Sequence, residues 1–259
     1  MNKKSNFFFL FSFLLPLLVF LSITLTIPTT FSFLFDKYVP SELFKMDFSL
    51  LRKEMIARTI VRRGITNTRV LEALNNVKRE EFVTPELAAH AYDDSPLDIG
   101  NGQTISQPYI VALMADALKI QPTSKVLDIG TGCGYSAAVY SRMTNEQVHT
   151  IERIPDLAQS ARIRLQKLGF SNVFVHEGDG TLGLPEYAPY DAISVAAGAP
   201  TIPNSLISQL NEGGRIVIPI ENDGYQELVL GIRQGDRLKT ESLGGVRFVP
   251  LLGEEGWRN

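Results

Sequence analysis

The spacing of apolar residues along the chain changes at about residue 120. Before this point apolar residues recur every three or four positions, which is the period of an amphipathic helix. Helices are predicted over 47–63 (with Gly64 as the stop signal), over 68–77, and from an N-cap at Ser106 to about Lys119. Residues 84–105, which contain two prolines and two glycines, are predicted to be loop-rich.

From residue 125 onward, short apolar runs alternate with helical stretches. Strands are predicted at 125–129, 148–151, 173–176, 192–195 and 215–220, helices at 135–142, 155–168 and 205–210, and a late strand pair at 228–232 and 237–243. Strands interleaved with helices are typical of an α/β fold with a doubly wound, mostly parallel sheet. The predicted fold class is therefore a Rossmann-like sheet with added N-terminal helices.

The N-terminus has a different composition. An almost continuous apolar run from Phe7 to Ile27 follows two lysines, and about twenty apolar residues suffice to cross a bilayer. We interpret residues 1–27 as a signal peptide or transmembrane anchor, 28–46 as a linker and 47–259 as the folded domain. This interpretation favours a membrane-anchored or exported protein, and a true start at Met46 is the alternative.

The net charge and the cysteine and histidine content argue against several kinds of site. The net charge of −3 offers no basic surface for nucleic acid. Cys133 is the only cysteine, which excludes an internal disulfide and a thiolate metal cluster. The three histidines are far apart in the sequence and lack the spacing of zinc ligands, so no metal is expected.

Cofactor chemistry is indicated by the glycine turn that follows the strand at 125–129. Gly130, Gly132 and Gly134 have the G-x-G-x-G spacing usual in S-adenosylmethionine (SAM)-dependent methyltransferases, whereas a nicotinamide fold favours G-x-G-x-x-G/A. Ligands of such sheets bind beyond the carboxyl ends of the strands. The turn therefore predicts a SAM site.

Three acidic residues follow strands of the predicted sheet and are candidates for the same site. Glu152 ends the next strand, where a carboxylate can accept hydrogen bonds from both ribose hydroxyls. Asp179 can accept from the adenine amino group, with Gly180 leaving room for the ring. Asp128 either helps to hold the methionine end of SAM or fixes the glycine loop by hydrogen bonds.

The sequence resembles the protein-L-isoaspartate (D-aspartate) O-methyltransferase family from about Met46 to Gly253. The residues that carry the resemblance are Gly102 to Pro108 (GQTISQP), Val126 to Ser136, Gly178 to Gly180, Pro189 to Ile193, Gln209 to Arg215 and Val246 to Leu251 (VRFVPL). The glycine loop is shared by many methyltransferases, whereas the GQTISQP and VRFVPL segments are particular to this family.

The resemblance implies methyl transfer from SAM to L-isoaspartyl and D-aspartyl side chains of damaged proteins, as the start of their repair. It implies that Thr104, Ile105 and Ser106 lie across the methyl donor, with Ser106 as the catalytic residue. It implies that Arg247, Val249 and Pro250 bind the substrate backbone, and that the C-terminal part of the sheet is modified. A monomer and a cytoplasmic location would be usual for the family.

Two rival functions remain open at this stage. The first is a SAM methyltransferase with another acceptor, although residues 194–200 lack the Asn/Asp-Pro-Pro-Tyr/Phe loop common in base-amino methyltransferases. The second is a non-catalytic SAM- or peptide-binding module tethered to a membrane. Methylation of a peptide with labelled SAM distinguishes all three.

Overall fold

The computed structural model describes residues 46–258, and residues 47–258 belong to one α/β unit. Contacts divide the chain into Met1–Met46 and Asp47–Asn259, and every element described below belongs to the second unit. No helix within 46–258 is long and apolar enough to cross a membrane. The predicted hydrophobic segment at 7–27 and most of the linker lie outside the described residues.

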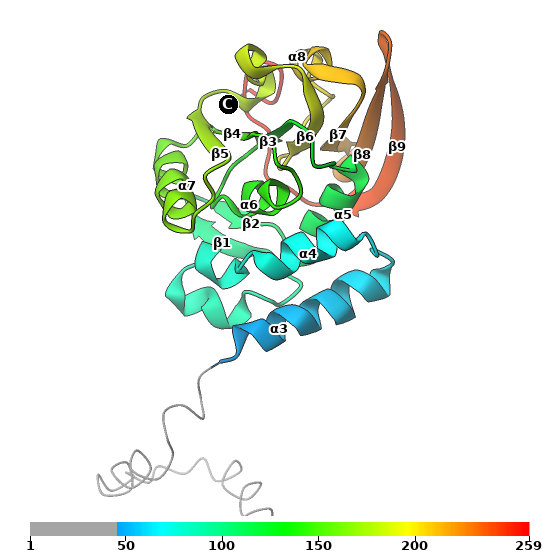
Figure 1. Cartoon of the computed structure of the whole chain (residues 1–259). Coiled ribbons are helices and arrows are strands. Elements are labelled where there is room, and N and C mark those ends of the chain that lie inside the picture. The colour runs from blue at the N-terminus through cyan, green and yellow to red at the C-terminus, as the bar shows by residue number, and fades with distance from the viewer. Residues whose placement is uncertain (1–45, 259) are drawn as a thin grey trace, which may run out of the picture. The chain divides into compact units, whose positions relative to one another are not determined.

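A seven-stranded sheet forms the centre of the unit (Figure 1). Its strands are β3 (Val126–Ile129), β4 (Val148–Glu152), β5 (Val173–Glu177), β6 (Tyr190–Val195), β7 (Leu210–Asn222), β8 (Tyr225–Gln234) and β9 (Arg237–Val246). Their order is β5-β4-β3-β6-β7-β8-β9, parallel as far as β7 and antiparallel from there to β9. The doubly wound class is thus confirmed, and the C-terminal modification is a meander that extends one edge.

Helices cover both faces of this sheet. They are α5 (Pro108–Leu118), α6 (Tyr135–Ser141), α7 (Pro155–Lys167) and α8 (Asn204–Ser208), with short 3₁₀ turns at η6 (Gly180–Leu182) and η7 (Pro185–Tyr187). Successive strand residues point to opposite faces, so Val126 and Val217 join one apolar cluster while Leu127 and Ile216 join the other. Both sides of the central strands are therefore core, as the apolar runs predicted.

The N-terminal elements form an additional layer that packs against α5 and α6. They are α3 (Phe48–Met55), η2 (Ile56–Ile60), η3 (Val61–Arg63), α4 (Thr68–Asn76), η4 (Arg79–Phe82) and η5 (Pro85–His90). The predicted helix at 47–63 is one continuous helical stretch that passes through a π segment and ends at Gly64, whose φ is +93°.

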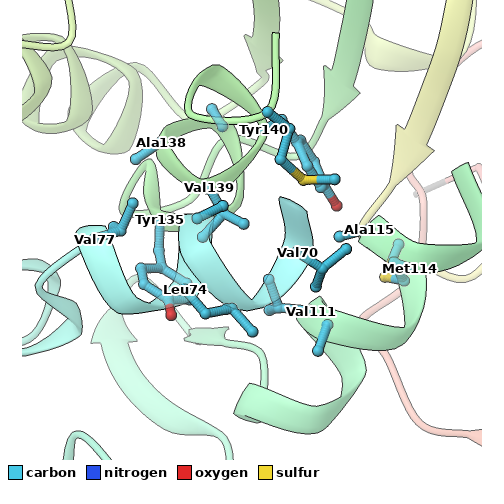
Figure 2. Close-up of a cluster of buried hydrophobic side chains, with 14 of the residues drawn as sticks. Val70, Leu74, Val77, Val111, Met114, Ala115, Tyr135, Ala138, Val139 and Tyr140 are labelled. Atoms are coloured by element: carbon cyan, nitrogen blue, oxygen red, sulfur yellow. The ribbon is translucent and has the colours of Figure 1, made fainter. Parts of the chain in front are cut away.

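Helix α4 joins this layer to the sheet domain. Its residues Val70 and Leu74, with Val77 just after its end, pack toward α5 and toward Tyr135 and Val139 of α6 (Figure 2). Full burial of an aliphatic side chain stabilises a fold by about 1.5–3 kcal/mol, so this contact holds the layer firmly in place.

Two expectations for residues 84–119 are wrong. The stretch predicted as loop-rich contains η5 and a hairpin, β1 (Leu97–Gly100) and β2 (Gln103–Ile105), which pair antiparallel. The N-cap of α5 is Gln107 and not Ser106, because Pro108 occupies the first helical position. The backbone N–H of Tyr109 is capped instead by Asp94 Oδ1 at 3.0 Å.

Candidate active site

A cleft of about 1140 Å³ opens at the carboxyl ends of β3, β4 and β6. Ten of the predicted site residues line it: Thr104, Ile105, Ser106, Gly130, Gly132, Glu152, Gly180, Arg247, Val249 and Pro250. They come from segments far apart in the sequence, and the fold brings them to one place. Asp128 and Asp179 do not line the cleft.

The glycine loop between β3 and α6 lines the floor of the cleft. Gly130 and Gly134 have φ of +91° and Gly132 has φ of +52°, which are left-handed conformations that other residues rarely adopt. A Cβ at Gly134 would also meet Leu165 Cδ1 at 3.0 Å. The loop therefore keeps its path only with glycine at these positions, and its backbone is open to a ligand.

Asp128 lies beneath this loop in a fully buried position. Its Oδ2 accepts a hydrogen bond from Thr150 Oγ1 at 3.0 Å, and Thr150 Oγ1 lies 2.7 Å from Thr131 Oγ1 in the loop. This chain of contacts supports the loop-fixing interpretation over direct contact with SAM. Oδ1 has no partner among residues 46–258, and burial raises the pKa of Asp128 to about 7.

We expect Asp128→Asn to gain stability relative to the wild type as pH rises. The folded protein keeps a proton that the unfolded chain releases near pH 4, so wild-type stability falls between about pH 4 and 7. The neutral amide avoids this cost, which reaches up to about 4 kcal/mol for a shift of three pKa units. Urea unfolding of both proteins at pH 5 and pH 8 measures the difference. Parallel pH dependences would contradict the assignment.

Glu152 connects the glycine loop to the turn after β4. Its Oε2 accepts from the Gly132 N–H at 2.9 Å, and its Oε1 accepts from the Ile154 N–H at 3.0 Å. The carboxylate is almost fully buried, yet it lines the cleft. Each carboxylate oxygen can accept a second hydrogen bond, so Glu152 has acceptor capacity left for a ligand's hydroxyl groups.

Asp179 and Gly180 follow β5 at the edge of the cleft. The Asp179 carboxylate accepts hydrogen bonds from Thr181 N and Oγ1 and from Glu254 N, at 2.7–2.9 Å. Through Glu254 it is bonded to residues 247–257, which we call the C-terminal segment. At Gly180 a Cβ would meet Ile129 Cγ2 at 2.5 Å, which leaves no room for any side chain. The predicted contact of Asp179 with adenine stays a prediction.

The segment Thr104–Ser106 forms the opposite wall of the cleft and is anchored by Arg79. This arginine is fully buried, and its Nη2 and Nε donate to Ser106 O at 2.8 Å and Ala91 O at 2.7 Å. Its guanidinium also lies over the Tyr135 ring, 4.8 Å from the centroid. Arg79 therefore holds the backbone of the predicted catalytic residue against the helix that follows the glycine loop.

The C-terminal segment forms another wall of the cleft. Gly198, which follows β6, donates to Val249 O and accepts from Leu251 N, both at 2.8 Å. Further along, Trp257 Nε1 donates to Gly198 O at 3.0 Å. These bonds place Val249 and Pro250 at the cleft wall, where Arg247 is also found.

Several residues that shape the site were not predicted. Arg63 and Tyr109 line the cleft: Arg63 Nη1 lies 3.0 Å from Asp94 Oδ2, and its guanidinium stacks on Tyr109. Arg79 and Gln226 also shape the site. The polar run around Arg79 has the pattern of an exposed surface, so only the fold reveals its burial.

A mostly parallel sheet, a glycine loop with G-x-G-x-G spacing after its first strand and a cleft-lining acid at the end of the next are typical of a Rossmann-like SAM-dependent methyltransferase. A sequence model of the family described as protein-L-isoaspartate(D-aspartate) O-methyltransferase matches residues 51–256. The chain belongs to this family.

Individual relatives agree with this assignment. The chain is 54% identical to protein-L-isoaspartate O-methyltransferase 2 of Marinobacter nauticus over 82% of its length and 97% of that protein. It is 52% identical to the protein-L-isoaspartate O-methyltransferase of Roseiflexus castenholzii over 82% and 96%.

Two solved structures share the fold. A protein-L-isoaspartate O-methyltransferase is 31% identical, with a TM-score of 0.72 over 79% of this chain and 67% of that one. A Plasmodium falciparum protein described as a beta-aspartate methyltransferase of the same kind, solved with S-adenosyl-L-homocysteine, is 26% identical. Its TM-score is 0.68 over 80% of this chain and 99% of that one.

Proposed function

We propose that the cleft binds SAM and transfers its methyl group to the side-chain carboxylate of L-isoaspartyl and D-aspartyl residues in damaged proteins. Family membership supports the reaction. The observation that carries the site assignment is that Thr104–Ser106, the glycine loop, Glu152 and Arg247–Pro250 line one cleft. Methyl-ester formation would start the repair of the damaged residue.

The residues of the cleft fit SAM. The backbone of Gly130 and Gly132 is open to the methionine end, Glu152 has acceptor capacity for the ribose hydroxyls, and Gly180 lines the cleft without a side chain where the adenine ring is expected. When bound, SAM supplies a methyl group attached to a positively charged sulfur. After transfer of the methyl group, that sulfur is the neutral thioether of S-adenosylhomocysteine.

The acceptor needs orientation and not a base. A carboxylate with an ordinary pKa near 4 is ionised at neutral pH, so an oxygen lone pair can attack the methyl carbon without proton transfer. The protein's task is to align this oxygen in line with the breaking carbon–sulfur bond and to exclude water. The Ser106 hydroxyl would donate a hydrogen bond to the carboxylate, and Arg247, Val249 and Pro250 would bind the flanking backbone.

The test is methyl transfer from labelled SAM to two peptides that differ only in isoaspartate or aspartate at one position. The full chain, purified in mild detergent, is expected to place base-labile label on the isoaspartyl peptide alone. Label on neither peptide, with SAM still bound, would overturn the proposal and favour another acceptor or a binding-only role.

Replacing Ser106 by alanine is expected to lower turnover while SAM affinity stays within about twofold. A hydrogen bond to a charged group contributes about 1.5–3 kcal/mol, which predicts a loss of about 10- to 100-fold. Steady-state kinetics with the isoaspartyl peptide measure it, with Ser160→Ala on the exposed side of α7 as the matched control. Wild-type turnover in the Ser106 variant would remove this residue from the mechanism.

Location and assembly form a separate proposal. The apolar run at 7–27 supports membrane association or export of the domain, whereas a cytoplasmic monomer is usual for the family. Reporter fusions at each end distinguish the two locations, and light scattering gives the oligomeric state. A protein found only in the cytosol would overturn membrane association.

A further inference from the structure

The backbone of Phe248, in the middle of the predicted substrate-binding residues, is held by a side chain with no assigned role. Phe248 N donates to Gln226 Oε1 at 2.6 Å, and Gln226 Nε2 donates to Phe248 O at 3.1 Å. One amide side chain thus satisfies both polar groups of one backbone residue, as a neighbouring strand would. This pairing supports the segment where β9 has already ended.

Gln226 lies at the start of β8 and lines the cleft. In the sheet it pairs with Val246, the last residue of β9, so the side chain bridges directly from the strand to the segment that follows. The segment is also held by the Gly198 backbone, which bonds to Val249 and Leu251. Residues 247–250 are therefore fixed by the Gln226 side chain and by the Gly198 backbone.

The surroundings also determine which way the amide faces. Gln226 Nε2 lies 3.5 Å from the Glu221 carboxylate, which favours the amino group on that side and the carbonyl toward Phe248 N. A Cβ at Gly198 would meet Gln226 Nε2 at 2.6 Å, so any other residue there would displace the amide from Phe248. The close approach of Gly198 and the contact with Glu221 therefore both fix the orientation of the Gln226 amide.

We propose that Gln226 is a positioning residue that sets the affinity for the substrate peptide by holding residues 247–250 in their binding conformation. The inference rests on the proposed function, since it takes these residues as the peptide-binding wall. Gln226 acts through Phe248 and not on the methyl donor. Its loss should therefore raise KM for the peptide and leave KM for SAM unchanged.

The variant Gln226→Glu tests this with almost no change of shape. Its ionised carboxylate still accepts from Phe248 N, but it has no proton to donate to Phe248 O, and it lies beside Glu221. At pH 8 we expect KM for the isoaspartyl peptide to rise about tenfold, as for the loss of one buried hydrogen bond, with KM for SAM within about twofold.

Acid should reverse this defect. The like charge of Glu221 and partial burial raise the pKa of the introduced carboxyl, and its protonated form regains the donor that the amide had. The ratio of variant to wild-type peptide KM is therefore expected to fall toward one between pH 8 and pH 5.5. Gln226→Met lacks both polar atoms, so its ratio should stay high at both pH values.

Controls separate the possible outcomes. Gln166→Glu on the exposed face of α7 adds the same charge elsewhere and should behave as the wild type. A peptide KM within twofold of the wild type at pH 8, an equal rise of both KM values, or no recovery in acid would overturn the role of Gln226. If Gln226→Glu fails to fold, Gln226→Met provides the test: its KM for the peptide should rise while its KM for SAM stays unchanged, and an equal rise of both would overturn the role of Gln226. A wild type inactive on the isoaspartyl peptide would instead refute the proposed function.

Discussion

Arg79→Ala is expected to lower the free energy of unfolding by roughly 3–5 kcal/mol, the range of the largest core truncations. The guanidinium is fully buried and has no carboxylate partner among residues 46–258, and it is held by Ala91 O, Ser106 O and the face of Tyr135. Its removal leaves two carbonyl groups without their donor and a cavity beside Tyr135. The gain from no longer burying a charge is smaller than these combined losses.

Arg63 provides a matched control for this prediction. It also stacks on a tyrosine, Tyr109, and it also bonds a neighbouring segment, at Asp94, but 46% of its side chain is exposed. Exposed ion pairs contribute about 0–1 kcal/mol, so Arg63→Ala should be nearly neutral. Urea unfolding of both variants gives the comparison. A loss below about 1 kcal/mol for Arg79→Ala would mean that the buried cation is replaceable.

Glu152→Ala is expected to weaken SAM binding by about 10²- to 10⁴-fold. Hydrogen bonds to a charged group contribute about 1.5–3 kcal/mol each, and the variant loses both expected ribose contacts. It also releases Gly132 N and Ile154 N, which shape the adjoining loop. Isothermal titration with SAM measures the change, and Glu152→Gln, which keeps the size of the side chain, should show a smaller loss.

The adjacent strand supplies the control. Glu177 of β5 is paired in register with Glu152 of β4, so it occupies the equivalent place one strand away. It is exposed and does not line the cleft. Glu177→Ala should therefore bind SAM as the wild type does. Equal losses in the two variants would show that the effect is general destabilisation and not loss of a ligand contact.

Much of the sheet could be predicted from the sequence because its strands are buried on both faces. A parallel strand such as β3 is an apolar run whatever its neighbours are, and the glycine turn that follows it marks the ligand side. Strand order was not predictable in this way, since it depends on contacts between segments far apart in the chain.

The hairpin β1-β2 was missed although the sequence carries a signal for it. Asn101-Gly102 has positive φ at both residues, 54° and 69°, as a two-residue hairpin turn requires. The flanking prolines and glycines favoured the interpretation as a loop. At this position the Asn-Gly pair, flanked by alternating apolar and polar residues, predicts the hairpin better than the nearby prolines and glycines predict a loop.

The positions of polar side chains depend on non-local contacts. Asp94 caps α5 across 15 residues, so a search for a local N-cap selects Ser106 instead. His149 and His176, far apart in the sequence, lie on neighbouring strands with Nδ1 and Nε2 3.1 Å apart, and burial lowers the pKa of His149 to about 4. Sequence spacing describes neighbours along the chain and not across a sheet.

The C-terminal segment has a consequence for copies of the protein that a protease has clipped. Every strand of the sheet precedes residue 247, so cleavage just after β9 would leave all the strands paired. It would remove the bonds of Glu254 to Asp179 and of Trp257 to Gly198, and with them one wall of the cleft. A clipped copy would therefore keep its sheet and lose its site, so a measurement of secondary structure alone would count it as intact.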